Sequence, residues 1–197
     1  MEERNINPIE QHDIHTRPHR SFELMEYDPN WVKEFEIRKQ KLAEILGDEV
    51  LDIQHIGSTA IPGMFSKPQI DILVVVRDLH NIKRRYDEML TAGFQPRGDY
   101  TGIEEEYFTE DDQRGVRLAS VHILPQGHPE IEGQINFRNY LIANENDRNL
   151  YAVTKKELFA RYRDDYSAYA RGKQQVIEII RQHVDQWAKR IPKSKGR

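Results

Sequence analysis

A glycine-serine pair, followed at short range by a lysine and an aspartate, offers the clearest chemistry in the sequence. Gly57 and Ser58 follow a strand-like alternation, and Lys67 and Asp71 come after a short loop. Glycine lets a ligand approach the backbone closely, and backbone N–H groups with a hydroxyl can grip phosphate oxygens. A carboxylate early in the next strand can hold a magnesium ion that bridges those phosphates. The spacing predicts a phosphate-handling cleft at Gly57, Ser58, Thr59 and Lys67, with Asp71 as metal ligand and catalytic residue.

The aspartate of this group has a structural alternative. Asp71 leads the apolar run from Ile70 to Val76, which is typical of a strand buried on both faces. A carboxylate in such a strand is costly unless it is paired, metal-bound or at the open end of the strand. Asp71 is therefore either a metal ligand or a carboxylate that caps neighbouring backbone N–H groups.

Three basic residues fall on apolar faces of the helices expected near the C-terminus. Arg138, Lys155 and Lys173 each lie among apolar residues at helical spacing. A buried cation without a partner is expensive, so each needs an anion or must reach the surface. We expect these three to line the cleft opposite the glycine-serine turn and to bind a triphosphate or an acidic acceptor. The alternative is internal salt bridges, for example to Glu157 or Asp71.

Two histidines lie in expected strands and differ in their surroundings. His122 lies inside the apolar run from Val121 to Leu124, and it is either a ligand or general base or a hydrogen-bonded core histidine. His55 shares a strand face with Leu51 and Ile53, which favours a structural role. No nucleophile-elbow pattern supports a serine hydrolase built on Ser58.

The pattern of apolar residues places these groups on a mixed framework. Strands are expected at 51–55, 70–76, 94–95, 104–109 and 116–124, and helices at 28–46, 78–92, 129–144, 147–163 and 166–187. Strands interleaved with helices, then helices alone, predict an α/β (α+β) fold with a mixed β-sheet core and a C-terminal helical part. The expected organisation is a tail at 1–20, a core at 22–125, a helical part at 129–188 and a basic tail at 189–197. Gly172 indicates that another element approaches the last helix closely.

Composition limits the classes of partner. The 197 residues carry a net charge of −4 and no cysteine, which excludes disulfides, thiolate metal sites and a cysteine nucleophile. No positive field favours nucleic acid or a membrane as partner. With no basic, apolar start at Met1 and no long apolar run, the cytoplasm is the expected compartment. His12, His15 and His19 have a spacing that could bind a metal, but a solvated tail is favoured.

The segment from His55 to Val76 resembles the signature of the GrpB family. The stretches Tyr27–Trp31, Phe137–Leu141 and Tyr169–Lys173 resemble its flanking motifs, and His122 resembles a family histidine. The family is similar in fold to the nucleotidyltransferase superfamily, whose members use a Gly-Ser turn and strand carboxylates to bind a nucleoside triphosphate with metal. The resemblance therefore implies a nucleotidyltransferase-like fold and magnesium as cofactor.

The sequence departs from that superfamily at its acidic residues. An active member usually has two acids one apart on the strand, whereas Gln69 and Leu73 flank Asp71 on its face. Two metal ions need several acidic ligands, so this single aspartate is expected to hold one magnesium ion and not two. The superfamily often supplies a third carboxylate from the region that here holds Glu104, Glu105 and Glu106. Because side chains alternate along a strand, Glu104 and Glu106 share one face of it. The run is either an exposed strand edge or, through Glu106, a replacement acid.

Three functions follow from these features. The first is a magnesium-dependent nucleotidyl or related phosphoryl transferase, in which Asp71 holds the metal and His122 or Glu106 assists the acceptor. The second is a binding module that keeps a nucleotide or anion pocket without turnover, which the missing second acid supports. The third is a scaffold that binds another protein through its helical part. The expected partner in the first two is a nucleoside triphosphate or another phosphate-containing small molecule.

Overall fold

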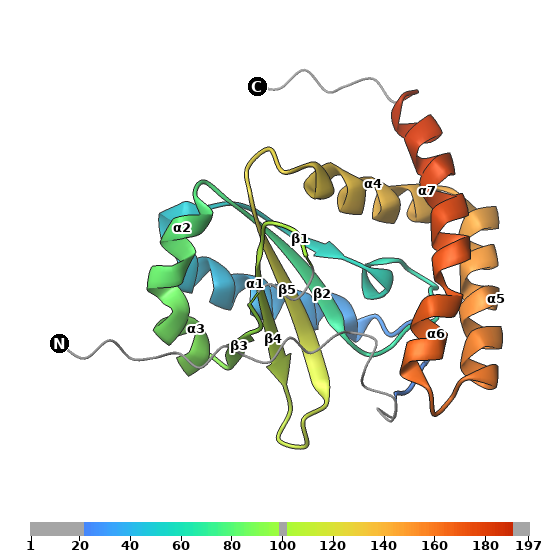
Figure 1. Ribbon diagram of the computed structural model, residues 1–197, viewed down its shortest axis with the longest axis horizontal. Helices are drawn as coiled ribbons and strands as arrows, with labels where there is room; N and C mark the ends of the chain where they lie inside the picture. Colours follow the sequence, from blue (N-terminus) through green and yellow to red (C-terminus); the bar gives the residue numbers. More distant parts are fainter. Residues whose placement is uncertain (1–21, 99–101, 191–197) are drawn as a thin grey trace.

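Five strands form one mixed sheet in the computed structural model, which describes residues 22–98 and 102–190 (Figure 1). The three histidines at 12, 15 and 19, the tail at 1–20 and the last seven residues lie outside this range. The spatial order is β1-β2-β5-β4-β3, with β2 and β5 parallel and the other neighbours antiparallel. The strands are β1 Val50–Ile56, β2 Ile70–Val76, β3 Phe94–Pro96, β4 Glu106–Asp111 and β5 Arg117–Pro125.

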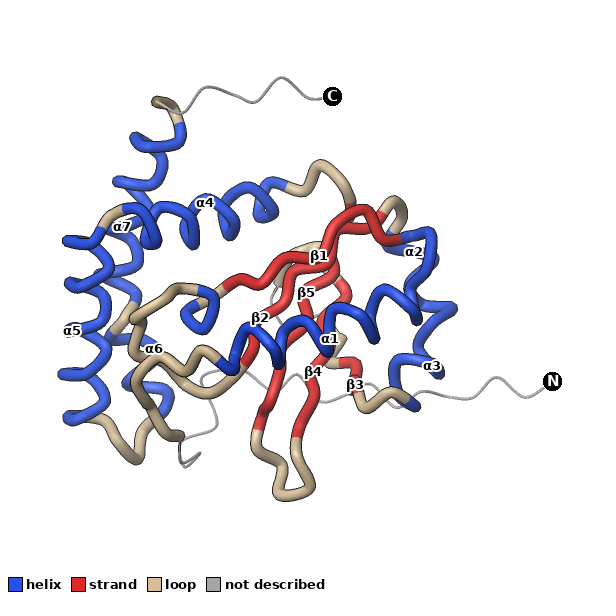
Figure 2. The backbone as a smooth tube through the Cα atoms, turned by 180° about the vertical axis from the view of Figure 1, so that it is seen from behind, coloured by secondary structure: helices blue, strands red, loops and turns tan. Residues whose placement is uncertain are grey.

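One face of the sheet packs against the N-terminal helices. These helices are α1 Asn30–Leu46, α2 Leu79–Ile82 and α3 Tyr86–Thr91, and Figure 2 shows α1 lying along the sheet. The Asp28 carboxylate accepts a hydrogen bond from the Asn30 N–H at 2.9 Å, two residues before α1 begins. The single helix expected at 78–92 is interrupted by a 3-10 turn at Lys83–Arg85. Trp31, Phe35 and Phe108 belong to the buried core between this layer and the sheet.

The C-terminal helices lie on the right of Figure 1, at the side of the molecule opposite to α2 and α3. They are α4 Pro129–Ala143, α5 Glu145–Arg161, α6 Tyr166–Gly172 and α7 Gln174–Ala188. The helix expected at 166–187 is thus two helices, and Lys173 lies at the break. A Cβ atom on Gly172 would lie 2.5 Å from Leu158 Cδ2, so α5 is the element whose close approach the glycine indicated.

Alternation along the central strands separates two sets of side chains. Ile72 and Val74 pack with α1, whereas Leu73 and Val75 pack with the partly buried Ile131 and Ile135 of α4. Asp71 belongs to the second set because side chains two apart share a face. It pairs with Ile56 on β1 and with Ser120 on β5, at the end of the sheet where α5 and α6 arrive. In the described part of the chain, no helix has the length and apolar character to cross a membrane.

Candidate functional site

The glycine-serine turn lies directly against the strand aspartate. Gly57 has φ 68° and ψ −169°, a backbone conformation that favours glycine. A Cβ atom on Gly57 would lie 2.3 Å from Asp71 Oδ2 and 2.9 Å from Asp71 Cβ. Gly57, which we expected to let a ligand approach the backbone closely, therefore also leaves the room that the Asp71 carboxylate needs. Because β1 and β2 are antiparallel neighbours, the end of one strand meets the start of the other.

A small cavity opens beside this turn, between the sheet and helices α5 and α6. We call it the lysine pocket; its volume is about 280 Å³. The structure brings five predicted phosphate-binding residues to its wall together with Asp71: Gly57, Ser58, Lys67, Lys155 and Lys173. The other lining residues are Ser66, Gln69, Tyr151, Tyr166 and Tyr169.

Each of the three lysines lies over a tyrosine ring. The distance from Nζ to the ring centroid is 4.6 Å for Lys67 over Tyr166, and 4.7 Å for Lys155 over Tyr151. Lys173 lies 4.7 Å over the ring of Tyr169. The described part of the chain shows no ion pair between any of these lysines and a carboxylate. Aromatic faces attract the ammonium groups but do not neutralise them.

Two of the lysines also donate hydrogen bonds to hydroxyl groups, and Lys67 lies 3.5 Å from the amide oxygen of Gln69. The Lys155 ammonium donates a hydrogen bond to Ser58 Oγ at 3.0 Å, and Lys67 donates to the Tyr166 hydroxyl at 3.0 Å. Lys155 is only 2% exposed. Burial, together with the charges of Lys173 and Lys67, lowers the pKa of Lys155 to about 6. Burial and the charge of Lys67 lower the pKa of Lys173 to about 8. An anion in the pocket would oppose both pKa shifts, because an opposite charge favours the protonated form of a lysine.

A side-chain amide occupies the position of the missing second acid. Gln69 Nε2 donates to Asp71 Oδ1 at 3.0 Å and to Ser120 Oγ at 2.9 Å. The Tyr107 hydroxyl lies 3.0 Å from the same Ser120 oxygen. Over the described residues, no group of three or more His, Cys, Asp or Glu side chains is placed to hold a metal ion. One carboxylate and bound phosphates fit a single magnesium ion, and they do not fit a two-metal site.

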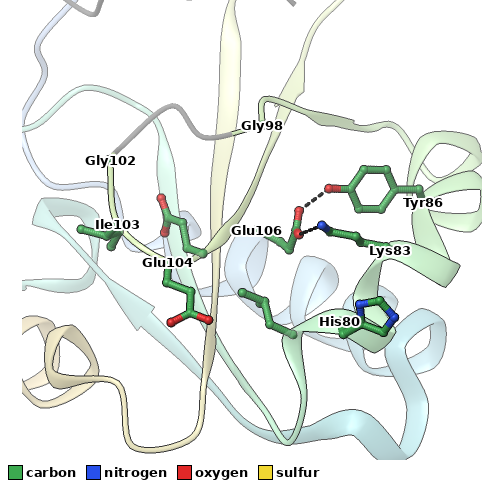
Figure 3. A pocket seen from close by; sticks show the side chains of 10 residues that line it. His80, Lys83, Tyr86, Gly98, Gly102, Ile103, Glu104 and Glu106 are labelled. Carbon is green, nitrogen blue, oxygen red and sulfur yellow. Dashed lines mark hydrogen bonds and ion pairs between the residues drawn. The ribbon is translucent and has the colours of Figure 1, made fainter. Parts of the chain in front are cut away.

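The structure does not bring Glu106, which we expected to assist at the cleft, to the lysine pocket. Glu106 accepts a hydrogen bond from the Tyr86 hydroxyl, and its carboxylate lies 3.9 Å from Lys83 Nζ. Figure 3 shows it pointing toward these two residues, which belong to the N-terminal helical layer. Glu106 points this way because it pairs with Ile123 on β5, and paired residues of neighbouring strands point to the same face. The Ile123 side chain lies in the core on the α1 face of the sheet.

Arg138 and Thr59 also differ from expectation. Arg138 does not line the lysine pocket. It donates hydrogen bonds to the His55 carbonyl oxygen at 2.6 Å and to Gln54 Oε1 at 3.0 Å, and thereby joins α4 to β1.

Thr59 is fully buried. Its hydroxyl donates a hydrogen bond to the Gln69 carbonyl oxygen at 3.2 Å and lies 3.0 Å from His55 Nε2. Its side chain therefore fastens the loop and does not face the pocket.

His55 has the structural role that its strand face favours. Its ring stacks on Phe35 with centroids 4.8 Å apart. Burial, followed by the charge of Arg138, lowers the pKa of His55 to about 4. The imidazole is therefore neutral at physiological pH and serves the packing between β1 and α1.

A second and larger cavity shares Gly57 and Asp71 with the lysine pocket. We call it the adjoining cavity; its volume is about 640 Å³. His122 lies in its wall, and His122 Nδ1 is 2.9 Å from Glu105 Oε2. The Glu105 side chain is 0% exposed. It contacts His122, so it points to the face of the sheet opposite to the face of Glu106. The remaining lining residues are Ile56, Glu130, Gly133, Gln134, Phe137, Ile177, Arg181, Val184 and Asp185.

Sequence reasoning missed the tyrosines of the lysine pocket. A signal existed for two of them, because Tyr151 and Tyr169 each precede a predicted lysine by four residues, and such residues are neighbours on a helix. Tyr166 reaches Lys67 from a position 99 residues away in the chain, which no local pattern reveals. The Glu105–His122 pair likewise joins a loop to a strand.

Comparison with known proteins gives one family and one wider fold. The family model described as GrpB protein matches residues 21–183. UPF0157 protein YqkA of Bacillus subtilis is 35% identical over 176 residues, which cover 89% of this chain and 51% of that protein. The chain thus spans about half the length of this relative.

Solved structures extend the comparison to the fold. The conserved protein GrpB from Enterococcus faecalis superposes with a TM-score of 0.78 and 29% identity, covering 84% of this chain and 99% of that one. A structure of Cid1, described as having RNA terminal uridylyl transferase activity, superposes with a TM-score of 0.50 and 14% identity over 69% of this chain and 42% of that one. The second likeness concerns the fold alone, and it agrees with the nucleotidyltransferase-like sheet and helices that the sequence predicts.

Proposed function

Because the chain belongs to the GrpB family and has a nucleotidyltransferase-like fold, we propose that it binds a nucleoside triphosphate in the lysine pocket with one magnesium ion. The observation that carries this proposal is the set of three lysines around one cavity of about 280 Å³ with no carboxylate in ion-pair contact among the described residues. Buried cations without partners are expensive, and a bound anion offsets that cost.

The charge of the pocket fits a polyphosphate. Lys67, Lys155 and Lys173 carry three positive charges when protonated, and Asp71 carries one negative charge, which leaves 3 − 1 = +2. A magnesium-bound triphosphate keeps a net negative charge, so the two are complementary. The Ser58 hydroxyl, already within hydrogen-bond distance of Lys155, supplies a further polar contact for a phosphate oxygen.

The aspartate would hold the metal jointly with the phosphates. Asp71 is the only acidic residue among those that line the lysine pocket in the described part of the chain. The Gln69 amide fixes Oδ1, and Gly57 leaves room for Oδ2. When bound, magnesium supplies neutralisation of phosphate charge; the residues supply one anionic ligand and a fixed orientation for it.

Transfer of the nucleotidyl group is a second candidate function. The observation that favours it is the His122–Glu105 pair, which lies in the cavity that shares Asp71 with the lysine pocket. A histidine oriented by a carboxylate is a common general base, and it can serve an acceptor without a second strand acid.

Thermal unfolding tests the proposal. We expect each well-bound nucleoside triphosphate to stabilise the wild type by about 2.7 kcal/mol at one hundred times its Kd, only when magnesium is present. Asp71→Ala and Asp71→Asn should lose this stabilisation, while Asp87→Ala, an exposed aspartate on α3, should keep it. The melting temperatures without ligand show which variants are folded. No stabilisation of the wild type by any nucleotide would refute the proposal.

A further inference from the structure

The adjoining cavity differs from the lysine pocket in size and in lining. Its volume is about 640 Å³ against about 280 Å³. Ile56, Phe137, Ile177 and Val184 give part of its wall an apolar surface. A concave site with an apolar wall and a few convergent polar groups is typical of a binding site for a small organic molecule. The two cavities share Gly57 and Asp71, so a molecule bound in one lies beside a molecule bound in the other.

The charges of the adjoining cavity have the opposite sign to those of the lysine pocket. The proposed magnesium ion would neutralise Asp71. The other charged lining residues are the half-buried Glu130 and the exposed Asp185 and Arg181, two acids against one arginine. None of these three forms an ion pair with a described residue. Gln134 adds a buried oxygen, Oε1, that has no hydrogen-bond partner among the described residues. Such a lining favours a ligand with a positive charge and hydrogen-bond donors.

A proton acceptor lies in the wall of the same cavity. The carboxylate of Glu105 accepts a hydrogen bond from Nδ1 of His122 when the carboxylate is ionised, at the observed distance of 2.9 Å. This contact leaves the lone pair on Nε2, which makes no hydrogen bond with a described residue. The ring of Tyr107 packs against the imidazole with centroids 4.8 Å apart and limits its rotation. His122 is therefore oriented as a general base is.

We propose that the adjoining cavity binds the acceptor of the transfer reaction, that this acceptor is a hydroxylated amine such as an amino sugar or an amino alcohol, and that His122 is its general base. The inference rests on the proposed function, because the nucleotide in the lysine pocket is the donor. Asp71 and Gly57 form the common wall of the two cavities, so the hydroxyl and the phosphates meet beside them. Glu105 acts through His122 as a positioning residue.

The reaction balances with these two substrates alone. The hydroxyl oxygen of the amine forms a bond to the α-phosphorus of the nucleotide. The bond between that phosphorus and the oxygen that bridges to the β-phosphate breaks, and pyrophosphate leaves. The hydroxyl proton passes to Nε2 of His122. Lys67, Lys155 and Lys173 stabilise the charge that develops on the leaving pyrophosphate.

Binding to the full chain without nucleotide tests the ligand class separately from the proposed function. The probes are glucosamine, its β-1,4-linked disaccharide and phenylethanolamine, each beside its neutral analogue: glucose, cellobiose and 1-phenylethanol. We expect calorimetric titration to show at least one amine that binds tenfold or more tightly than its analogue. Glu130→Gln with Asp185→Asn should remove that preference, and Asp87→Asn on the opposite helical layer should not. Equal binding within every pair, or no binding of any amine, would overturn the ligand class.

Pyrophosphate release tests the role of His122. With a magnesium–nucleotide that stabilises the protein and an amine that binds, we expect pyrophosphate release, with kcat reduced roughly 100-fold in His122→Gln. Glu105→Gln should lower kcat, shift the acid limb of the pH profile and leave KM unchanged, which a merely structural role would not do. No release despite binding of both substrates would overturn the assignment. Amine binding without nucleotide binding would instead refute the proposed function and the transfer step that depends on it, and would leave only the ligand class of the adjoining cavity standing.

Discussion

Two groups of buried and half-buried cations in this molecule differ in their partners. Around β4, Arg38 lies 2.5 Å from Glu110, and Arg117 lies 2.9 Å from Asp111. We call these residues, together with Arg97, the paired network; Arg97 also contacts Asp111, at 2.6 Å. In the lysine pocket the cations instead contact tyrosine rings and hydroxyl groups. Each arginine of the paired network already has a carboxylate partner, so the network needs no ligand and serves the fold. The lysine pocket has an excess of positive charge, which is typical of a site for an anion.

The largest expected effect belongs to the paired network. Arg38 is 7% exposed and forms ion pairs with Glu110 and Glu34. Arg38→Met leaves the partly buried carboxylate of Glu110 without its buried partner, so we expect the free energy of unfolding to fall by about 3 kcal/mol. Urea unfolding measures this, and titration under native conditions should show nucleotide affinity unchanged. A loss of less than 1 kcal/mol would mean that the two groups of cations are not energetically different.

Gly57→Ala should damage the lysine pocket and the fold together. The added Cβ meets the carboxylate of Asp71 at 2.3 Å, and the positive φ strains any side chain. We expect a loss of about 3 kcal/mol in the free energy of unfolding and loss of nucleotide binding. Gly63→Ala is the matched control, because Gly63 has φ 78° but nothing within 4 Å of the added atom. It should cost only the backbone strain, about 1–2 kcal/mol. Equal losses at both positions would show that contact with Asp71 is unimportant.

Lys155→Met should separate binding from stability. The variant removes the most buried lysine of the pocket, so we expect the Kd for a magnesium–nucleotide to rise roughly 100-fold, about 2.7 kcal/mol. The free energy of unfolding should stay equal or rise, because an apolar side chain replaces a buried cation without a carboxylate partner. Lys156→Met is the matched control: Lys156 is an exposed neighbour that pairs with Glu26. If the Lys155 variant instead unfolds more easily and binds normally, the lysine is structural.

The smallest expected effect is a dependence of affinity on pH. The pKa of Lys155 is lowered to about 6 and that of Lys173 to about 8, so above these values the empty pocket has lost protons. A bound polyphosphate raises both pKa values, and binding therefore takes up protons. Affinity should fall as pH rises from 6 to 9, by at most about tenfold per pH unit for each proton. Titration in two buffers of different ionisation enthalpy measures the uptake. No proton uptake at pH 7 would contradict the lowered pKa values.

The same lysine gives a stability trend of defined sign. Its pKa is lower in the folded state than the ordinary value of 10.5, so the unfolded chain binds more protons between about pH 6 and 10.5. The folded state is therefore penalised most below pH 6, and this penalty is relieved as pH rises. The difference in unfolding free energy between wild type and Lys155→Met should therefore become smaller as pH rises from about 6 to 10.5.

Much of the site could be predicted because it depends on local patterns. The apolar run of β2, the turn before it and the helical spacing of Lys155 and Lys173 are visible in the sequence. Gly172 revealed a close contact because a glycine inside a helical pattern usually has a packing reason. The family resemblance supplied the fold.

The errors arise where local patterns leave two faces equivalent. Both faces of the sheet are covered by helices, so the glutamate run could not show that Glu105 faces His122 while Glu106 faces Tyr86. Arg138 lies on an apolar helical face as expected, but which groups it meets depends on how α4 crosses β1. The break at Lys173 depends on the packing of α6 against α5. These are tertiary effects.

A crystal structure with magnesium and a non-hydrolysable triphosphate analogue tests the central claim most directly. The account predicts phosphate oxygens within hydrogen-bond distance of the Nζ atoms of Lys67, Lys155 and Lys173, with one magnesium ion on Asp71. Phosphates bound elsewhere, with these three lysines still held by their tyrosines, would contradict it.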